Sequence, residues 1–305
     1  MNYRESFIGR LEISNKIYLL VVWITLLVVF IATFYPIYYV FIYSINDPAA
    51  VAPGLMLIPR RLSFNAYQAI LSSSLVHRAF MISAARAIIG PILSLIVTML
   101  IAFPLSIRAL PGRRVLNWYF IITMYVSAGL IPYFLLIMNL GLMNTFSVYI
   151  IPGLVGVFNM ILIRTYMESL PESLRESAEI DGASYFRIFV QIVTPLCLPV
   201  MAAITLFLAV GQWNAFSDAL LFNIRSEHLY PLQFVLARMV QGLRFDAGDQ
   251  LHDIAQAMDA AGQQLVTPRT MRLAITVVTI VPITMVYPFL QRYFVKGLMI
   301  GSIKG

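Results

Sequence analysis

Charged residues are scarce in this chain of 305 residues. They make up 11% of the sequence, while hydrophobic residues make up 60% and the mean hydropathy is +0.83. Soluble domains carry about 25% charged residues, so this composition excludes an ordinary soluble domain and predicts a chain solvated mostly by lipid. Because membrane spans of about 20 residues each use up most of the length, we expect one membrane domain rather than two soluble ones.

Residues that support catalysis or metal binding are also scarce. Cys197 is the sole cysteine, which excludes an internal disulfide, and its apolar surroundings favour a packed side chain over a reactive thiol. His77, His228 and His252 are isolated and lack metal-ligand spacing. The sequence contains no G-x-x-x-x-G-K-[ST] phosphate loop and no nucleophile elbow. We therefore expect a non-catalytic chain without a cofactor or metal of its own.

Six apolar stretches are long enough to cross about 30 Å of hydrocarbon. The first begins too late and runs too long for a cleaved signal peptide, so it is expected to be retained. We predict an all-α membrane protein with a cytoplasmic N-terminal segment over 1–16 and one transmembrane domain over 17–305. The predicted spans are 17–44, 79–107, 115–138, 149–167, 196–221 and 272–295, joined by a cytoplasmic loop at 168–195 and an outer segment at 222–271, among others.

Basic residues predict the orientation of these spans. The formal net charge is +7, but the basic residues lie between apolar segments instead of forming a nucleic-acid-binding patch. Four groups near span ends fall on one side, which should be the cytoplasmic side and should hold both termini. The groups are Arg4, Arg10 and Lys16; Arg108, Arg113 and Arg114; Arg164, Arg175 and Arg187; and Arg292, Lys296 and Lys304.

Prolines and glycines recur inside the predicted spans. Kinked helices around a pathway would explain them, because neighbouring helices or cavity water can satisfy the freed backbone groups. The general abundance of both residue types in membrane helices explains them equally well. The positions are Pro36, Pro91, Pro104, Gly129, Pro132, Gly211, Pro282 and Pro288.

The loop between the fourth and fifth spans has the character of soluble helix. Ser169 and Glu172 have capping-box spacing, which predicts a helix that runs to Ile180, and Asp181-Gly182 predicts a turn before a second amphipathic stretch. This second stretch places three aromatic residues on or near one face. Either the protein's own helices cover that face, or a partner receives the bent helix in a groove. The aromatic residues are Tyr185, Phe186 and Phe189.

The same loop resembles a known signature. Its residues match the EAA motif of importer permeases of the ATP-binding cassette superfamily at fixed offsets over twenty residues. Ser177 replaces the usual first Ala and Thr194 the usual Leu, and both changes leave the bend intact. The resemblance assigns coupling to an ATPase to Glu176, Ser177, Ala178, Asp181, Gly182, Ala183, Phe186, Ile192 and Pro195.

Further segments extend the resemblance across nearly the whole chain and are similar to the carbohydrate branch of these permeases, especially those for complex oligosaccharides. In such permeases, which have the type I importer fold, the loop is a coupling helix seated in a cleft of the nucleotide-binding subunit. Closure of the ATPase dimer then moves the spans. The matching segments are 102–106 (AFPLS), 129–132 (GLIP), 141–145 (GLMNT), 212–214 (QWN) and 287–297 (YPFLQRYFVKG).

Two ionisable residues lie inside predicted spans at similar depth. Arg86 and Asp218 would each cost roughly 3 kcal/mol or more if unpaired in lipid. We expect them to face the bundle interior and to pair, although Arg86 could instead contact an anionic sugar. Gln212, Trp213 and Asn214 add an indole and two amides, with Asn214 one turn from Asp218 on the same face. They fit either a sugar-lined path or hydrogen bonds between helices.

The outer segment 222–271 is too long for a simple connection and predicts a folded loop or a partner surface. By resemblance, its core would contact an extracytoplasmic solute-binding protein. The stretch 245–268 is rich in Asp, Ala, Gln and Gly and could equally be variable. The expected contact residues are Tyr230, Pro231, Leu232 and Gln233.

The resemblance implies a heteromeric complex in a prokaryotic plasma membrane. Its other members would be a second homologous permease, two cytoplasmic ATPase subunits that bind ATP and magnesium, and the solute-binding protein. The cargo would be a complex oligosaccharide, neutral or acidic, from plants or algae, although the EAA motif alone does not distinguish sugars from other solutes. A self-contained secondary carrier would need ion-coupling carboxylates at mid-membrane and often shows inverted repeats. The sequence shows neither clearly.

Overall fold

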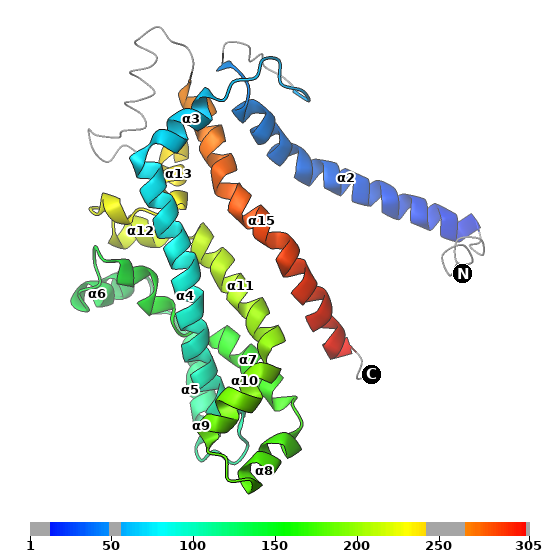
Figure 1. Ribbon diagram of the computed structural model, residues 1–305, viewed down its shortest axis with the longest axis vertical. Helices are drawn as coiled ribbons and strands as arrows, with labels where there is room; N and C mark the ends of the chain where they lie inside the picture. Colours follow the sequence, from blue (N-terminus) through cyan, green and yellow to red (C-terminus); the bar gives the residue numbers. More distant parts are fainter. Residues whose placement is uncertain (1–12, 49–55, 242–265, 303–305) are drawn as a thin grey trace. The chain divides into compact units, whose positions relative to one another are not determined.

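The structure, a computed structural model, describes residues 13–48, 56–241 and 266–302 (Figure 1). These residues are mostly helical, and none of them belongs to a named β-strand. They fall into two compact units. The first holds the described residues up to Ile70 and those from 266 to Val277, and the second holds those from Leu71 to 241 and from Val278 onward.

The first unit is built on α2 (Ile13–Ser44), whose apolar side chains are exposed along most of its length. Only its last turns pack, where Ile42 and Tyr43 are buried together with Met56. Beyond the helix, Asn46 pairs with Leu62 in an isolated antiparallel bridge. A helix with so much apolar surface on all sides requires lipid or other protein around it.

The core of the second unit forms where α4 (Ser74–Ser106) packs against α7 (Val157–Glu168) and α11 (Leu198–Asn214). Apolar residues at helical spacing supply this contact, and the lone cysteine is one of them, as expected for a packed thiol. The buried residues are Met99, Ala102, Phe103, Leu105, Met160, Ile163, Met167, Ala178, Ile188, Cys197 and Ile204.

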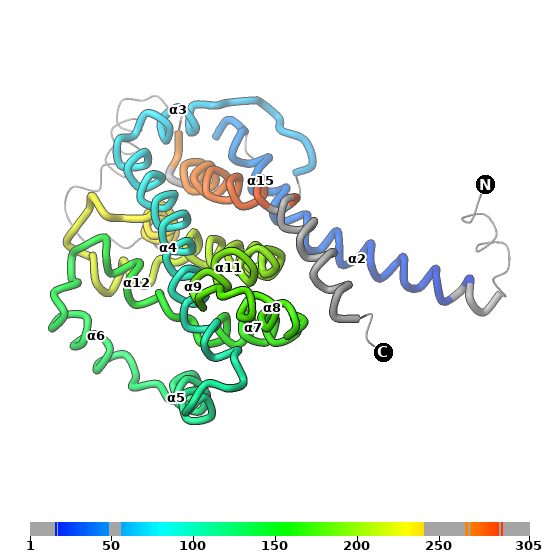
Figure 2. Tube along the Cα trace, turned by 60° about the horizontal axis from the view of Figure 1, so that its bottom comes forward, coloured from blue at the N-terminus to red at the C-terminus, as the bar shows by residue number. Residues whose placement is uncertain are grey.

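The predicted span over 115–138 is interrupted by a sharp bend. The stretch is divided into α5 (Arg113–Tyr125) and α6 (Leu130–Asn139), which meet at an angle of 113°. Gly129, at φ 84° and ψ 175°, adopts a conformation that is essentially restricted to glycine. Pro132 follows in the first turn of α6, where its missing N–H costs no helical hydrogen bond. Figure 2 shows α5 and α6 at the margin of the α4–α7–α11 core.

The predicted span over 196–221 is interrupted as well. The helix α11 ends at Asn214, Ala215 is extended, and α12 (Ser217–Phe222) begins a separate short helix. At the other end, α11 meets the preceding helical stretch at 78°. The break at Ala215 frees its carbonyl oxygen, which becomes an acceptor for a buried side chain of α4 described below.

Three helical stretches satisfy the length and hydropathy of a membrane span by themselves, and each of three bent pairs satisfies them when its two helices are taken together. The described residues therefore hold three such spans, or up to six if each bent pair counts as one. The single stretches are Tyr18–Ser44, Ser74–Ser106 and Arg269–Val286, the last within α15 (Pro268–Ser302), and the pairs are Arg113–Tyr125 with Leu130–Asn139, Phe146–Gly153 with Val157–Glu168, and Tyr185–Leu196 with Leu198–Asn214.

The backbone conformation at Gly129 generates a stability prediction. Gly129→Ala should lower the free energy of unfolding by about 1–3 kcal/mol, because a Cβ strains this φ and ψ even though nothing lies within 4 Å of it. Gly211→Ala is the matched control, since Gly211 lies in α11 with equally open space and an ordinary backbone conformation. Thermal unfolding of both variants in detergent measures the difference. Equal midpoints would contradict the assignment of strain to Gly129.

Candidate functional site

The loop at 168–195 folds into two short helices joined by a sharp bend. The first is α8 (Glu172–Ile180), and the second, α9 (Tyr185–Ile188), continues through a π-helical turn and α10 toward α11. The predicted end of the first helix at Ile180 is confirmed. The predicted capping box is wrong, because Pro171 occupies the N-cap position and Ser169 Oγ donates back to the carbonyl of Tyr166.

The bend is a Schellman motif. The N–H of Gly182 donates to Glu179 O at 3.0 Å, and the N–H of Ala183 donates to Ala178 O at 2.9 Å, which are the two hydrogen bonds that define this helix ending. Gly182 takes φ 78°, where glycine is favoured. A physical role thus exists for the Asp-Gly-Ala part of the signature: Asp181 ends the helix, glycine reverses the chain, and alanine closes the turn.

The inner face of this bent segment is anchored to the core. Ala178 and Ile188 are buried among residues of α4 and α7, and the rings of Phe103 and Phe189 lie 5.1 Å apart. Ser184 caps α9 by accepting a hydrogen bond from the N–H of Arg187 at 3.3 Å. These contacts hold the bend against the ends of two long helices.

The outer face of the bend carries exposed apolar side chains. Ile180 is 86% exposed, Phe186 70% and Tyr185 57%. Of the nine residues that the resemblance assigns to coupling, only Ala178 is buried, and Ala183 and Ile192 are half-buried. The others are exposed: Glu176, Ser177, Asp181, Gly182, Phe186 and Pro195. The segment therefore combines a packed base with a bare apolar tip.

A cluster of charged residues joins the base of this segment to two other helices. Glu168, the last residue of α7, pairs with Arg113 of α5 and, at 3.3 Å, with Arg164. Arg113 Nε also donates to the carbonyl of Leu105 at 2.7 Å, and Arg164 bonds to Asn117 of α5. In the sequence, Arg113 and Arg164 were interpreted only as basic residues that set the orientation of the spans. One acidic residue at the end of an apolar stretch was the available signal for the cluster.

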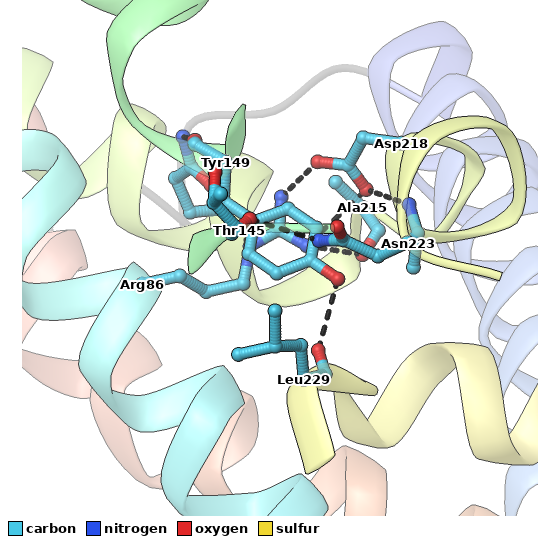
Figure 3. A network of polar contacts seen from close by, with 9 residues as sticks. Arg86, Thr145, Tyr149, Ala215, Asp218, Asn223 and Leu229 are labelled. Carbon is cyan, nitrogen blue, oxygen red and sulfur yellow. Dashed lines mark hydrogen bonds and ion pairs between the residues drawn. The ribbon is translucent and has the colours of Figure 1, made fainter. Parts of the chain in front are cut away.

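A second polar network lies farther along α4, around the buried guanidinium of Arg86 (Figure 3). Arg86 Nε donates to Gln212 Oε1 at 3.0 Å, and Nη1 donates to Ala215 O at 3.2 Å. The two terminal nitrogens bind both carboxylate oxygens of Asp218. The predicted pairing of Arg86 with Asp218 is confirmed. These four hydrogen bonds use all but one of the N–H groups of a guanidinium.

The network extends to the chain segment before α7. The guanidinium lies 4.3 Å from the ring centroid of Tyr149, whose carbonyl accepts from Gln212 at 3.1 Å and whose hydroxyl donates to Leu229 O at 2.9 Å. The absence of a side chain at Gly90 leaves space for Gln212, because a Cβ at position 90 would lie 3.2 Å from the amide of Gln212. One buried cation thus ties four separate parts of the second unit together. Sequence reasoning missed Tyr149 and Gly90, which carry no charge.

The other predicted path residues point elsewhere. Trp213 is buried and its indole N–H donates to Thr279 O at 3.1 Å, while Asn214 is exposed and accepts a hydrogen bond from Gln233 at 3.0 Å. The prediction that Asn214 and Asp218 share one helix face is wrong, because α11 ends at Asn214. The network holds only three of the five predicted residues.

The residues expected to contact a binding protein are mostly internal. Tyr230 is 4% exposed and Leu232 is fully buried, with its N–H donating to Ser83 Oγ of α4 at 2.8 Å. Pro231 is buried as well, so of the four predicted residues only Gln233 retains partial exposure. This part of the outer segment leads into α13 (Leu232–Gln241) and anchors it on α4. Residues 242–265 of the same predicted segment lie outside the described residues.

Comparisons with known proteins identify the family. Residues 79–300 match the model of the binding-protein-dependent transport system inner membrane component family. The chain is 36% identical over 256 residues to the polygalacturonan/rhamnogalacturonan transport system permease protein YtcP of Bacillus subtilis strain 168, covering 84% of this chain and 86% of that protein. It is 35% identical over 275 residues to Protein LplC of the same strain, covering 90% of each.

A solved structure agrees with this match. One chain of a bacterial ABC transporter involved in the import of the acidic polysaccharide alginate is similar with a TM-score of 0.85 and 33% identity, covering 93% of this chain and 99% of that chain. The prediction of an all-α membrane protein with the fold of a type I importer permease is confirmed. The chain belongs to the family of binding-protein-dependent transport system inner membrane components, the membrane-embedded permeases of ATP-binding cassette importers.

Proposed function

We propose that this chain forms one half of the translocation path of an ATP-driven oligosaccharide importer and that the α8–α9 bend docks onto an ATPase subunit. One similar protein is a permease of a polygalacturonan/rhamnogalacturonan transport system, and another belongs to a transporter involved in the import of alginate. Both support a carbohydrate, and more narrowly an acidic oligosaccharide, as the cargo. The complex would contain a second permease, two ATPase subunits that bind ATP and magnesium, and an extracytoplasmic solute-binding protein.

The exposed apolar tip of the bend is the observation that carries the docking proposal. Ile180, Tyr185 and Phe186 present large apolar surfaces at the end of two short helices. Such a patch on a polar loop marks a partner site, and a short amphipathic helix that inserts into a groove is a recurrent mode of recognition. The buried base fixes the tip in an exposed position, which supports a partner groove over a cover formed by the protein's own helices.

The base of the bend offers a mechanical connection from the ATPase to the membrane path. Displacement of α8 and α9 would move α4 and α7, because Ala178 and Ile188 pack against those two helices. It would also move α5, because Arg113 of α5 is ion-paired with Glu168 at the end of α7. The helix α4 carries it onward, since the 20 residues between Ser106 and Arg86 correspond to about 30 Å of helix. ATP-driven closure of the ATPases would then reposition the elements held by the Arg86 network.

The contacts of Arg86 favour a structural role over recognition of an anionic sugar. Four of its five N–H groups already donate hydrogen bonds within the protein, and its side chain is 1% exposed. Trp213 has no free ring face for stacking on a sugar, because it is buried against Phe80. The amides of Asn214 and Gln233 remain as candidates for hydrogen bonds to sugar hydroxyls, because Asn214 is exposed, Gln233 is partly exposed and the two amides bond to each other.

A test of the function uses the complex assembled with its two ATPases, its second permease and its binding protein in proteoliposomes. Oligosaccharide in the presence of the binding protein should stimulate ATP hydrolysis and enter the vesicles. Gly182→Asp should reduce both about tenfold, because a side chain in the left-handed conformation costs about 1–2 kcal/mol and the new charge enters the docking face. Insertion of the subunit in the membrane should be unchanged.

Ser177→Ala is the matched control for this variant. It alters the same exposed segment toward the usual signature and leaves the Schellman hydrogen bonds in place, so stimulated hydrolysis should stay close to that of the unaltered complex. Normal stimulation in Gly182→Asp would contradict docking through this bend. Transport by the chain alone, without ATPase subunits, would make it a secondary carrier.

The Arg86 network gives a separate prediction. Arg86→Gln leaves the carboxylate of Asp218 without its partner and should destabilise the subunit by about 3–5 kcal/mol. The double variant Arg86→Gln with Asp218→Asn removes both charges and should recover most of this loss. Thermal unfolding in detergent measures stability, and uptake of neutral and uronate-bearing oligosaccharides measures specificity. A selective loss of uronate uptake in the stable double variant would restore the ligand role of Arg86.

A further inference from the structure

A basic pocket lies between the end of α4 and the first turns of α5. Its cavity volume is about 670 Å³. The described residues that line it include no carboxylate. Its polar and aromatic lining consists of Arg108, Arg113, Arg114, Asn117, Trp118 and Arg164. The docking mechanism proposed above makes no use of this cavity.

Two of the four arginines retain a free charge. Arg113 and Arg164 already bind Glu168, which partly neutralises them. Arg108 and Arg114 are exposed, and neither makes an ion pair or a hydrogen bond through its side chain to any residue in the described ranges. The single carboxylate of Glu168 therefore leaves the surroundings of the pocket with an excess of positive charge and with unused guanidinium donors, which suits a phosphate group.

The pocket borders an apolar surface of the kind that contacts lipid. The long apolar helix α4 ends at Ser106, directly before the first of these arginines. On α5, Trp118 is 57% exposed and its neighbours Val115 and Tyr119 are 73% and 61% exposed. Tryptophan and tyrosine concentrate where the membrane meets water, at the level of the phospholipid headgroups. Guanidinium groups and exposed apolar side chains thus meet within one turn of helix.

We propose that this pocket binds the phosphate of an anionic phospholipid such as phosphatidylglycerol. Arg108 and Arg114 bond the phosphate oxygens, and the exposed face of α5 receives the acyl chains. A free phosphate ion would use the same arginines, but it would leave the adjoining apolar face uncovered, so the lipid is the source that accounts for both features. Basic pockets at the ends of membrane helices are recurrent sites for such headgroups.

Quenching of Trp118 by brominated lipids tests this proposal. The full-length chain is placed in phosphatidylcholine nanodiscs that contain a small fraction of brominated phosphatidylglycerol or brominated phosphatidylcholine. The difference in fluorescence quenching between the unaltered chain and the Trp118→Phe variant gives the contribution of Trp118. Phosphatidylglycerol should quench more strongly. Arg108→Gln with Arg114→Gln should reduce that preference about 25-fold, since each arginine near an anionic surface contributes roughly fivefold in binding.

Two control variants separate site binding from general attraction. Arg60→Gln with Arg78→Gln removes the same charge at exposed positions outside the pocket and should leave the preference unchanged. Arg108→Lys with Arg114→Lys keeps the charge and should retain most of it. Equal quenching by both lipids, or an unchanged preference after the glutamine substitutions, would overturn the proposal. Equal quenching is also the result expected of a site that takes free phosphate, because inorganic phosphate brings no brominated chain to Trp118.

Discussion

A buried guanidinium must have its charge neutralised and its donors satisfied, and the second unit is arranged around this requirement at Arg86. The carboxylate of Asp218 provides the counter-charge, while Gln212 and the carbonyl of Ala215 accept the remaining hydrogen bonds. The break between α11 and α12 serves the same purpose, because a helical Ala215 would spend its carbonyl on the next turn. A break in a helix leaves backbone groups without hydrogen bonds, which is costly in lipid. Here the side chain of Arg86 from α4 satisfies the freed carbonyl.

A different constraint applies to the α8–α9 coupling segment, which packs near the C-terminal end of α4. The coupling segment must expose an apolar tip to a partner and yet transmit force, so its base has to be rigid. Schellman hydrogen bonds around Gly182 fix the bend, and burial of Ala178 and Ile188 fixes its seat. Because α4 joins this seat to the Arg86 network, a push on the loop and a rearrangement of the network are parts of one movement in the proposed mechanism.

The features that could be predicted from the sequence are those set by local chemistry. The end of α8 and the turn at Gly182 follow from nearby residues, and the pairing of Arg86 with Asp218 follows from the cost of an isolated charge in lipid. The break at Gly129 had a visible signal, but glycine and proline are common in membrane helices and did not by themselves indicate a bend of 113°. Propensity cannot distinguish a kink from a continuous helix.

Other features depend on tertiary contacts that the sequence does not reveal. Leu232 was predicted to be part of a partner surface, yet it is buried, and its backbone N–H donates to Ser83 Oγ, 149 residues away in the sequence. Likewise, Glu168 and Tyr149 acquire their roles only when distant helices come together. The pattern of apolar and charged residues along the sequence predicts which segments enter the membrane. It does not predict which side chains contact one another there.

If the apolar tip of the α8–α9 bend is the docking element for an ATPase, the bound ATPase must shield it from reagents in solution. Cys197 is buried, so Ile180→Cys, combined with Cys197→Ala, places one reactive thiol at a position that is 86% exposed. A maleimide should modify it rapidly in the permease alone and slowly once the ATPase subunits are bound. Equally rapid modification in the assembled complex would contradict docking at this site.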